Sequence, residues 1–369
     1  MTKIHDLYYE HGQSAWLDNL RRGWLTDGEL VRWVERGVRG ITSNPTIFQK
    51  AMAGSDEYDD QFRDMVGGGE SASDLYWTMA IADIEAALRI LRPVHDESGG
   101  VDGFVSLEVA PELARDVAGT VASARDLHDR IAEPNLFVKV PATAEGVEAI
   151  RTLIGEGRSI NVTLIFGLDR YAEVMEAYVA GLEAYDGDLA GVRSVASFFV
   201  SRVDTEVDQR LEAIGTPEAL ALRGRAAVAQ AQAAYGRFLA TFSGPRWEAL
   251  AARGAHVQRP LWASTSTKNE AYPDTLYVDT LIGPDTVNTM PEATLEAFED
   301  HGTLARTVDA DVGAAEATLA AIEAVGVDMG DVGRVLEDQG VATFAKSFDE
   351  LIASLDAKAD DLRSGSQGN

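Results

Sequence analysis

Three short stretches of the sequence combine an apolar face with single polar residues that could do chemistry. They read FVSLEV (104–109), LFVKV (136–140) and INVTLIF (160–166). Successive side chains of a strand point to opposite faces, and in all three stretches Val and Leu share one face. The opposite face then carries Ser106, Glu108, Phe137, Lys139, Asn161 and Thr163. An amine, a carboxyl group and a hydroxyl on converging faces are the groups that covalent chemistry on a carbonyl compound needs.

Lys139 lies between Val138 and Val140, in a strand whose other residues favour burial. One interpretation is a buried ion pair with Glu108, because charges in a protein interior are normally paired. A second is a carbamylated lysine that bridges two metal ions. That site needs several histidines at strand ends, and only His256 occurs at the margin of an apolar run. A third is an amine nucleophile, because burial disfavours the ammonium form and a neutral amine can form a Schiff base with a carbonyl group.

The Schiff-base interpretation requires two further kinds of group. A carboxyl group must move protons to and from the carbinolamine and a sugar hydroxyl, and a hydroxyl group must hold the relay water. Glu108 and Asp18 are carboxylic acids, and Thr163 supplies a hydroxyl. We therefore expect these three residues to work with Lys139.

Two later stretches, 196–202 and 263–269, pair hydroxyl groups with cations near the ends of apolar runs. The candidate residues are Ser197, Phe199, Arg202, Ser264, Ser266 and Lys268. Such pairs at the carboxyl end of a barrel suit the phosphate group of a sugar phosphate. Arg202 could instead form a surface salt bridge with Asp204 or Glu206.

The elements that must position these residues are short β-rich runs, which alternate with helical patterns up to about residue 290. The eight runs cover residues 14–20, 37–45, 103–111, 135–143, 159–166, 192–202, 256–265 and 276–284. Eight strand–helix units favour a (β/α)8 TIM barrel over an open doubly wound sheet, and no glycine-rich nucleotide motif follows the first run. We predict one domain over residues 1–369, with a barrel at about 12–290, C-terminal capping helices at about 291–362 and a frayed tail at 363–369.

The composition excludes several classes of function. The chain of 369 residues has no cysteine, which rules out disulfides, thiolate metal sites and a cysteine nucleophile. Its six histidines are not paired at metal-ligand spacing, so we expect no metal. A formal charge of −28 argues against binding to nucleic acid or an anionic membrane. An anionic substrate would need local cations, because charges beyond about 8 Å are screened.

The location of the protein is also suggested by what the sequence lacks. No apolar run reaches 18 residues, and the first 20 residues do not read as a signal peptide. We therefore expect a cytoplasmic protein.

Six motifs together resemble those of the transaldolase family. They are GVRGITSNPTIF, FVSLEVAP, NLFVKVPAT, GRSINVTLIFGLDRY, ASFFVSRVD and LWASTSTKN, in the family's order and spacing over about residues 12–300. The resemblance implies a cofactor-free class I aldolase barrel of the pentose phosphate pathway, acting on soluble sugar phosphates as a monomer or homodimer. The implied reaction moves a dihydroxyacetone unit from sedoheptulose 7-phosphate to glyceraldehyde 3-phosphate, giving erythrose 4-phosphate and fructose 6-phosphate.

The resemblance also implies roles for individual residues. Lys139 resembles the Schiff-base lysine, Glu108 the acid/base carboxylate that works through a water, Thr163 the residue that holds this water, and Asp18 the group that handles the proton of the cleaved hydroxyl. Positions that bind the substrate or its phosphate match Asn44, Asn161, Ser197, Phe199, Arg202 and Ser264. Many relatives carry arginine two residues after the last of these serines. Here Ser266 takes that place, and the nearby cation is Lys268.

The alternative is a fructose 6-phosphate aldolase-like enzyme, which uses the same imine but releases free dihydroxyacetone. Enzymes of that kind are much shorter and typically carry glutamine and tyrosine where Glu108 and Phe199 stand here. Both features favour the transferase. A barrel that serves only as a scaffold would be expected to lose Lys139 or Glu108, and both are present.

Overall fold

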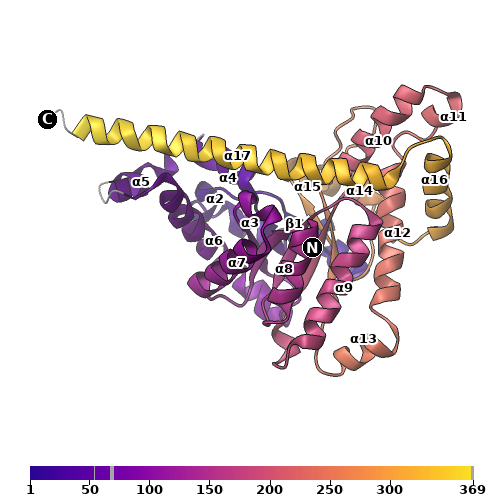
Figure 1. Ribbon diagram of the computed structural model, residues 1–369, viewed down its shortest axis with the longest axis horizontal. Coiled ribbons are helices and arrows are strands. Elements are labelled where there is room, and N and C mark those ends of the chain that lie inside the picture. The colour runs from indigo at the N-terminus through magenta and orange to yellow at the C-terminus, as the bar shows by residue number, and fades with distance from the viewer. Residues whose placement is uncertain (54, 67–69, 367–369) are drawn as a thin grey trace.

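A closed barrel of eight parallel strands, arranged in chain order, forms the centre of the molecule (Figure 1). The computed structural model describes residues 1–53, 55–66 and 70–366. The strands are β1 (Gln13–Leu17), β2 (Gly40–Thr42), β3 (Phe104–Glu108), β4 (Leu136–Pro141), β5 (Ile160–Ile165), β6 (Ser194–Phe199), β7 (Arg259–Ala263) and β8 (Thr286–Met290). Pairing of β8 with β1 closes the barrel. The predicted TIM barrel is therefore confirmed.

The last strand lies later in the chain than predicted. Residues 276–284, expected as the eighth strand, instead begin with the short helix α14 (Leu276–Asp279), and β8 follows at Thr286–Met290. A short apolar run can belong to a buried helix or a buried strand, and periodicity alone does not separate them. In this helix Tyr277 and Val278 are buried, which explains the apolar pattern.

Helices cover the outside of the barrel. They are α1 (Lys3–His11), α2 (Arg22–Thr26), α3 (Glu29–Glu35), α4 (Pro45–Ala53), α5 (Asp59–Val66), α6 (Ala72–Glu97), α7 (Val117–Ile131), α8 (Ala144–Ile154), α9 (Leu168–Ala184), α10 (Ser201–Ile214), α11 (Pro217–Leu220), α12 (Ala226–Thr241), α13 (Gly244–Ala251), α14, α15 (Glu292–His301), α16 (Val312–Ala324) and α17 (Met329–Ser366). N-cap residues fix where some of these helices begin. The side chain of Asp116 accepts a hydrogen bond from a backbone amide in the first turn of α7, and the side chain of Thr143 does the same for α8.

Of the helices predicted to cap the barrel after residue 290, only α17 crosses its carboxyl end (Figure 1). α15 packs beside β8 and α1, because it directly follows β8 and takes the outer position of an eighth barrel helix. α16 packs on α12. α17 continues to Ser366, so residues 363–366 are helical rather than frayed; the helix contains no proline. The remaining predicted tail residues, 367–369, lie outside the described residues.

The close approach of α17 to the barrel depends on Gly340. A Cβ atom at this position would lie 3.0 Å from Cδ2 of Leu164, whose side chain packs against the helix. The register of β5 slips between Val162 and Ile165, and Leu164 there has a φ of 59°. This bulge turns Leu164 toward α17, although strand alternation predicts that it faces the outer helices.

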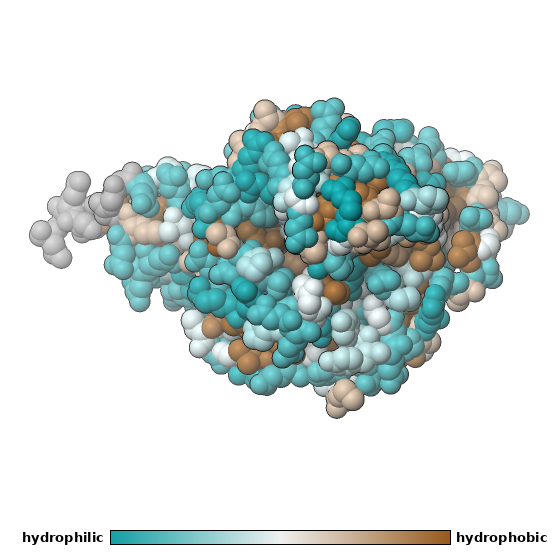
Figure 2. All heavy atoms as spheres, turned by 90° about the horizontal axis from the view of Figure 1, so that it is seen from below, coloured by the Kyte–Doolittle hydropathy of each residue, from teal (hydrophilic) through white to brown (hydrophobic). Residues whose placement is uncertain are grey.

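The molecular surface is mostly hydrophilic, with apolar residues in small separate groups on the face seen in Figure 2. No helix in the described ranges is long and apolar enough to cross a membrane. Among the same residues, no group of three or more His, Asp or Glu side chains is arranged to hold a metal ion.

Candidate active site

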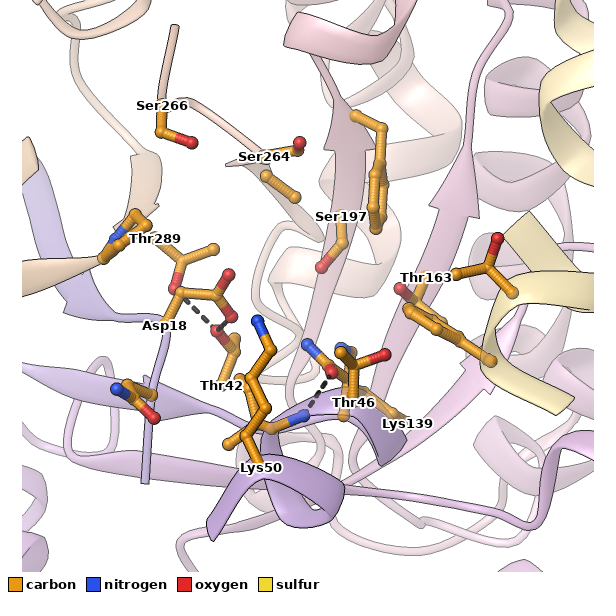
Figure 3. Close-up of a pocket in the computed structure, with 18 of the residues that line it drawn as sticks. Asp18, Thr42, Thr46, Lys50, Lys139, Thr163, Ser197, Ser264, Ser266 and Thr289 are labelled. Atoms are coloured by element: carbon orange, nitrogen blue, oxygen red, sulfur yellow. Dashed lines mark hydrogen bonds between the residues drawn. The ribbon is translucent and has the colours of Figure 1, made fainter. Parts of the chain in front are cut away.

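A cavity of about 640 Å³ opens at the carboxyl end of the barrel strands (Figure 3). It gathers nine of the eleven residues that the sequence singled out as catalytic or substrate-binding. These nine are Asp18, Asn44, Lys139, Thr163, Ser197, Phe199, Arg202, Ser264 and Lys268. They come from the ends of β1, β2, β4, β5, β6 and β7, because parallel strands of a barrel bring their carboxyl ends to one face.

The other two predicted residues, Glu108 and Asn161, do not line the cavity but lie directly behind residues that do. The Oε2 atom of Glu108 is 3.5 Å from Nζ of Lys139. The side chain of Asn161 donates a hydrogen bond of 3.0 Å to Oγ of Ser106 and accepts one of 2.7 Å from Oγ of Ser197. Asn161 therefore contacts the cavity wall rather than the cavity.

Lys139 occupies the centre of this arrangement. The register pairs it with Glu108 on β3 and with Asn161 on β5, so its side chain points into the barrel as strand alternation predicts. Its side chain is 5% exposed, and Nζ donates a hydrogen bond of 3.0 Å to the carbonyl oxygen of Ser43. The ion pair with Glu108 is present, and the same amine also faces the cavity. The ion-pair and nucleophile interpretations are thus compatible.

Two opposing effects act on the pKa of the Glu108 carboxyl group. Burial raises the pKa of its carboxyl group, although the charge of Lys139 opposes this shift. Oε2 of Glu108 and Oγ1 of Thr163 are both buried, and neither makes a hydrogen bond within the described part of the chain. The pair is therefore available to polar atoms that enter the site.

Asp18 follows β1 directly and faces Lys139 across the cavity floor. Oγ1 of Thr42 donates to Oδ1 of Asp18 over 2.7 Å and lies 2.7 Å from Oγ1 of Thr289, as the dashed lines in Figure 3 show. Burial raises the pKa of Asp18, against the opposing charge of Lys139. Two carboxyl groups with raised pKa values thus flank one buried amine.

The sequence matches the family model described as transaldolase/fructose-6-phosphate aldolase over residues 15–355. The chain belongs to this family. It is 53% identical over 346 residues to the transaldolase of Thermobifida fusca, covering 92% of this chain and 94% of that protein. It is 51% identical over 362 residues to the transaldolase of Frankia alni, covering 97% of each chain. Transaldolase 1 of Streptomyces coelicolor is 50% identical over 361 residues, or 95% of each chain. The protein is therefore an enzyme of the transaldolase/fructose-6-phosphate aldolase family.

Within this transaldolase-family barrel, Arg202 lies in the first turn of α10 rather than at the end of a strand. The side chain is half-buried, and its guanidinium carbon is 5.4 Å from the ring centroid of Phe199. The alternative salt bridge with Asp204 or Glu206 is wrong. Glu206 pairs with Arg210 at 2.8 Å, and Asp204 accepts hydrogen bonds from the hydroxyl of Tyr277 and from a backbone amide. Arg202 makes no ion pair with any residue of the described ranges.

Lys268 lies on the loop after β7, and its Nζ donates a hydrogen bond of 2.6 Å to Oγ of Ser266. The hydroxyl of Tyr272 anchors this loop to α10 by donating to Oδ2 of Asp208 over 2.6 Å. Partial desolvation of its amine lowers the pKa of Lys268, and the charge of Arg202 lowers it further. Arg202 and Lys268 both line the cavity and lie near enough to act on each other's charge, with Asp18 as the nearby carboxyl group. Two neighbouring cations are suited to a phosphate group.

Ser264 sits at the start of the same loop with a φ of 55°, in the left-handed region that serine rarely adopts. Its Oγ lies 2.9 Å from Oγ of Ser201 in the first turn of α10. Strained backbone of this kind clusters at functional sites, and here it aims the loop at the cavity.

Sequence reasoning missed several residues that complete the site. Thr42 and the carbonyl of Ser43 come from β2 and the residue after it, and the inward position of Thr42 could have been found from strand alternation. Lys50 of α4 and Phe344 of α17 also line the cavity. No local signal marks these two, because only the packing of their helices brings them there.

Proposed function

We propose that the protein is a transaldolase of the pentose phosphate pathway. In this proposal it transfers a dihydroxyacetone unit from sedoheptulose 7-phosphate to glyceraldehyde 3-phosphate, giving erythrose 4-phosphate and fructose 6-phosphate. The observation that carries the proposal is Lys139, a buried amine that faces a polar cavity with Glu108 at 3.5 Å. A cytoplasmic location and a monomeric or homodimeric state remain predictions.

The first half of the reaction consumes the donor. Nζ of Lys139 passes a proton to Glu108 and attacks the C2 carbonyl of the ketose. The carbinolamine then loses water to form an iminium ion. Asp18 takes the proton of the C4 hydroxyl as the C3–C4 bond breaks, and the electron pair of that bond moves into the iminium group. The aldose leaves, and a three-carbon enamine stays on Lys139.

The second half reverses these steps with the acceptor. The enamine carbon attacks the aldehyde of the acceptor, Asp18 returns its proton to the new alkoxide, and water releases the product from the lysine. Both carboxyl groups must therefore exchange protons near neutral pH, which their raised pKa values favour. In the proposal Glu108 works through a water held by Thr163. The buried, unbonded oxygens of these two residues support that role.

The remaining residues bind the substrate in this scheme. Arg202 and Lys268 hold the phosphate, with Ser264 as a further donor, because they converge on one end of the cavity. Asn44 presents its amide nitrogen to the sugar hydroxyls, since its Oδ1 already accepts from the backbone of Ile47 at 3.0 Å. Ser197 and Phe199 line the cavity wall, and Asn161 acts through its hydrogen bond to Ser197.

Trapping of the intermediate tests the proposal. Sodium borohydride added with fructose 6-phosphate should leave a reduced three-carbon adduct on the peptide that contains Lys139, detected by mass spectrometry. The Lys139→Met variant should fold and give no adduct. An adduct on another lysine in the wild-type protein contradicts the assignment. A coupled assay with erythrose 4-phosphate decides between the two activities, because the aldolase alternative releases free dihydroxyacetone and the transferase does not.

A further inference from the structure

A third cation faces the same cavity as Arg202 and Lys268, but from the other side of the barrel. It is Lys50, in the last turns of α4. α4 follows β2, whereas Arg202 follows β6, and these two strands lie opposite each other in a barrel of eight strands in chain order. Figure 3 shows the side chain of Lys50 rising from α4 with its amine directed toward the space that Asp18 and Ser197 also face.

The ammonium group of Lys50 has no partner among the described residues, unlike the other cation on its side of the cavity. Arg21 also lines the cavity, but its guanidinium forms an ion pair with Glu292 and stacks over the ring of Trp24 at 4.5 Å. The side chain of Lys50 makes no hydrogen bond or ion pair with any residue in the described part of the chain. Its charge is therefore available to a ligand, while that of Arg21 is already neutralised.

The helix that carries Lys50 is held in place by α17. Oγ1 of Thr46 and Oγ of Ser347 lie 2.8 Å apart, and the amide of Gln49 donates to Glu350 over 2.7 Å. Thr46 and Lys50 are four residues apart and so lie on the same side of α4. The contact with α17 therefore keeps Lys50 at the cavity.

The charges around the cavity are arranged for an anion. The pKa of Lys268 is lowered first by partial desolvation and then by the charge of Arg202, and the charge of Lys50 lowers it further, against Asp18. A dianion that binds beside these cations relieves the repulsion between them. The protein as a whole carries a formal charge of −28, so a local group of cations differs in sign from the net charge of the molecule.

We propose that Lys50 binds the phosphate group of the sugar phosphate together with Arg202 and Lys268. This inference rests on the proposed transaldolase function for the identity of the substrate, but not for the presence of a phosphate site. Lys50 and Lys268 are both exposed, whereas Arg202 is half-buried. Lys50 therefore contributes a screened point charge, and its effect on binding is smaller than that of Arg202.

The Lys50→Ala variant tests this role in steady-state kinetics. The KM for fructose 6-phosphate should rise roughly threefold to tenfold, while turnover at saturating donor changes less than about twofold, because the interaction is equal in the ground and transition states. The KM for unphosphorylated fructose should stay the same. Lys50→Arg should restore most of the loss, since it keeps the charge at the same position.

Lys346→Ala is the matched control. Lys346 lies on α17, its side chain is 76% exposed, and it does not line the cavity. The Lys346→Ala substitution also removes one positive charge, and it should leave the KM for fructose 6-phosphate unchanged. Equal effects of the two alanine variants, or equal losses for phosphorylated and unphosphorylated donors in Lys50→Ala, would overturn the inference.

A binding measurement separates this inference from the proposed function. Calorimetric titration of the wild-type protein with inorganic phosphate should give a dissociation constant that rises at least twofold in Lys50→Ala and not in Lys346→Ala. If phosphate binding depends on Lys50 in a protein that shows no transaldolase activity, the proposed function fails and the phosphate site stands. If phosphate binds equally to all three proteins, the proposed role of Lys50 fails whatever the activity.

Discussion

Both ends of the barrel interior contain a buried carboxyl group, but the two groups differ in their hydrogen bonds and in the direction of their pKa shifts. At the amino end, Asp102 is fully buried and accepts four hydrogen bonds of 2.7 to 3.1 Å. The donors are Ser14, Trp16, Arg39 and Arg259. Burial alone would raise the pKa of Asp102, but the charges of Arg259 and Arg39 hold it below the ordinary value. The ionised form is the one this end of the barrel stabilises.

At the carboxyl end, Glu108 has one cation near it, Lys139, and an oxygen without a hydrogen bond in the described ranges. Burial outweighs the charge of Lys139, and the pKa of Glu108 is raised. The same barrel thus contains one carboxyl group, that of Asp102, with four hydrogen-bond donors, and another, that of Glu108, with an oxygen that accepts no hydrogen bond within the described residues. A saturated hydrogen-bond network fixes structure, whereas an unsaturated one leaves atoms free to exchange protons.

The largest effect is expected from Glu108→Gln, which keeps the shape of the side chain but cannot transfer a proton. Turnover should fall by about 10²–10⁴-fold, the usual contribution of a general acid or base. The free energy of unfolding at neutral pH should not decrease, because the raised pKa shows that the ionised form is disfavoured in the folded protein. Turnover near that of the wild type would reduce Glu108 to an ion-pair partner of Lys139.

The matched change at the closed end, Asp102→Asn, should have the opposite pattern. It leaves Arg39 and Arg259 buried without their shared carboxylate, so the free energy of unfolding should fall by about 3–5 kcal/mol in urea denaturation. Turnover per folded molecule, counted by the borohydride adduct, should stay within about twofold of the wild type. A loss of turnover with full stability would show that the closed end also takes part in catalysis.

The Arg202→Ala variant tests how an arginine at the carboxyl end of the barrel differs from one at the amino end. Unlike Arg259, which shares Asp102, Arg202 has no ion pair within the described chain. We expect kcat/KM for fructose 6-phosphate to fall by an amount equivalent to about 2–4 kcal/mol, with little change for unphosphorylated fructose. Lys268→Ala should show the same pattern with a smaller loss, since an ammonium group supplies one point charge. Equal losses of kcat/KM for both donors would mean that Arg202 stabilises the fold rather than binding the phosphate.

The smallest effect is a difference in how the two carboxyl groups respond to pH. The pKa of Asp102 is below its ordinary value of 3.8, so its stabilising effect is complete above that pH and is lost as the pH falls through the folded value. The pKa of Glu108 is above its ordinary value of 4.5, so wild-type protein should lose stability relative to Glu108→Gln as the pH rises from 4.5. Urea denaturation from pH 3 to pH 8 should show stability differences of opposite slope, and parallel slopes would contradict the comparison.

Much of the site could be predicted from single strands. The positions of Glu108, Lys139 and Thr163 followed from alternation between Val or Leu and polar residues, because the two faces of a buried strand are set by a period of two. The same logic failed at Leu164, where a bulge changes the direction of the side chain, and at residues 276–284, where a helix of four residues buries the apolar groups. In both places the deciding contact lies far away in the chain.

The sequence by itself determined seven of the eight strands, the polar residues that face the barrel interior and the acidic balance of the surface. These are consequences of local periodicity and composition. Only the tertiary structure decided that α17 crosses the open end, that the carbonyl of Ser43 accepts a hydrogen bond from Lys139, and that Lys50 lines the cavity. Each of these depends on the packing of helices against strands that are distant in the sequence, and no short stretch of residues encodes the distance between them.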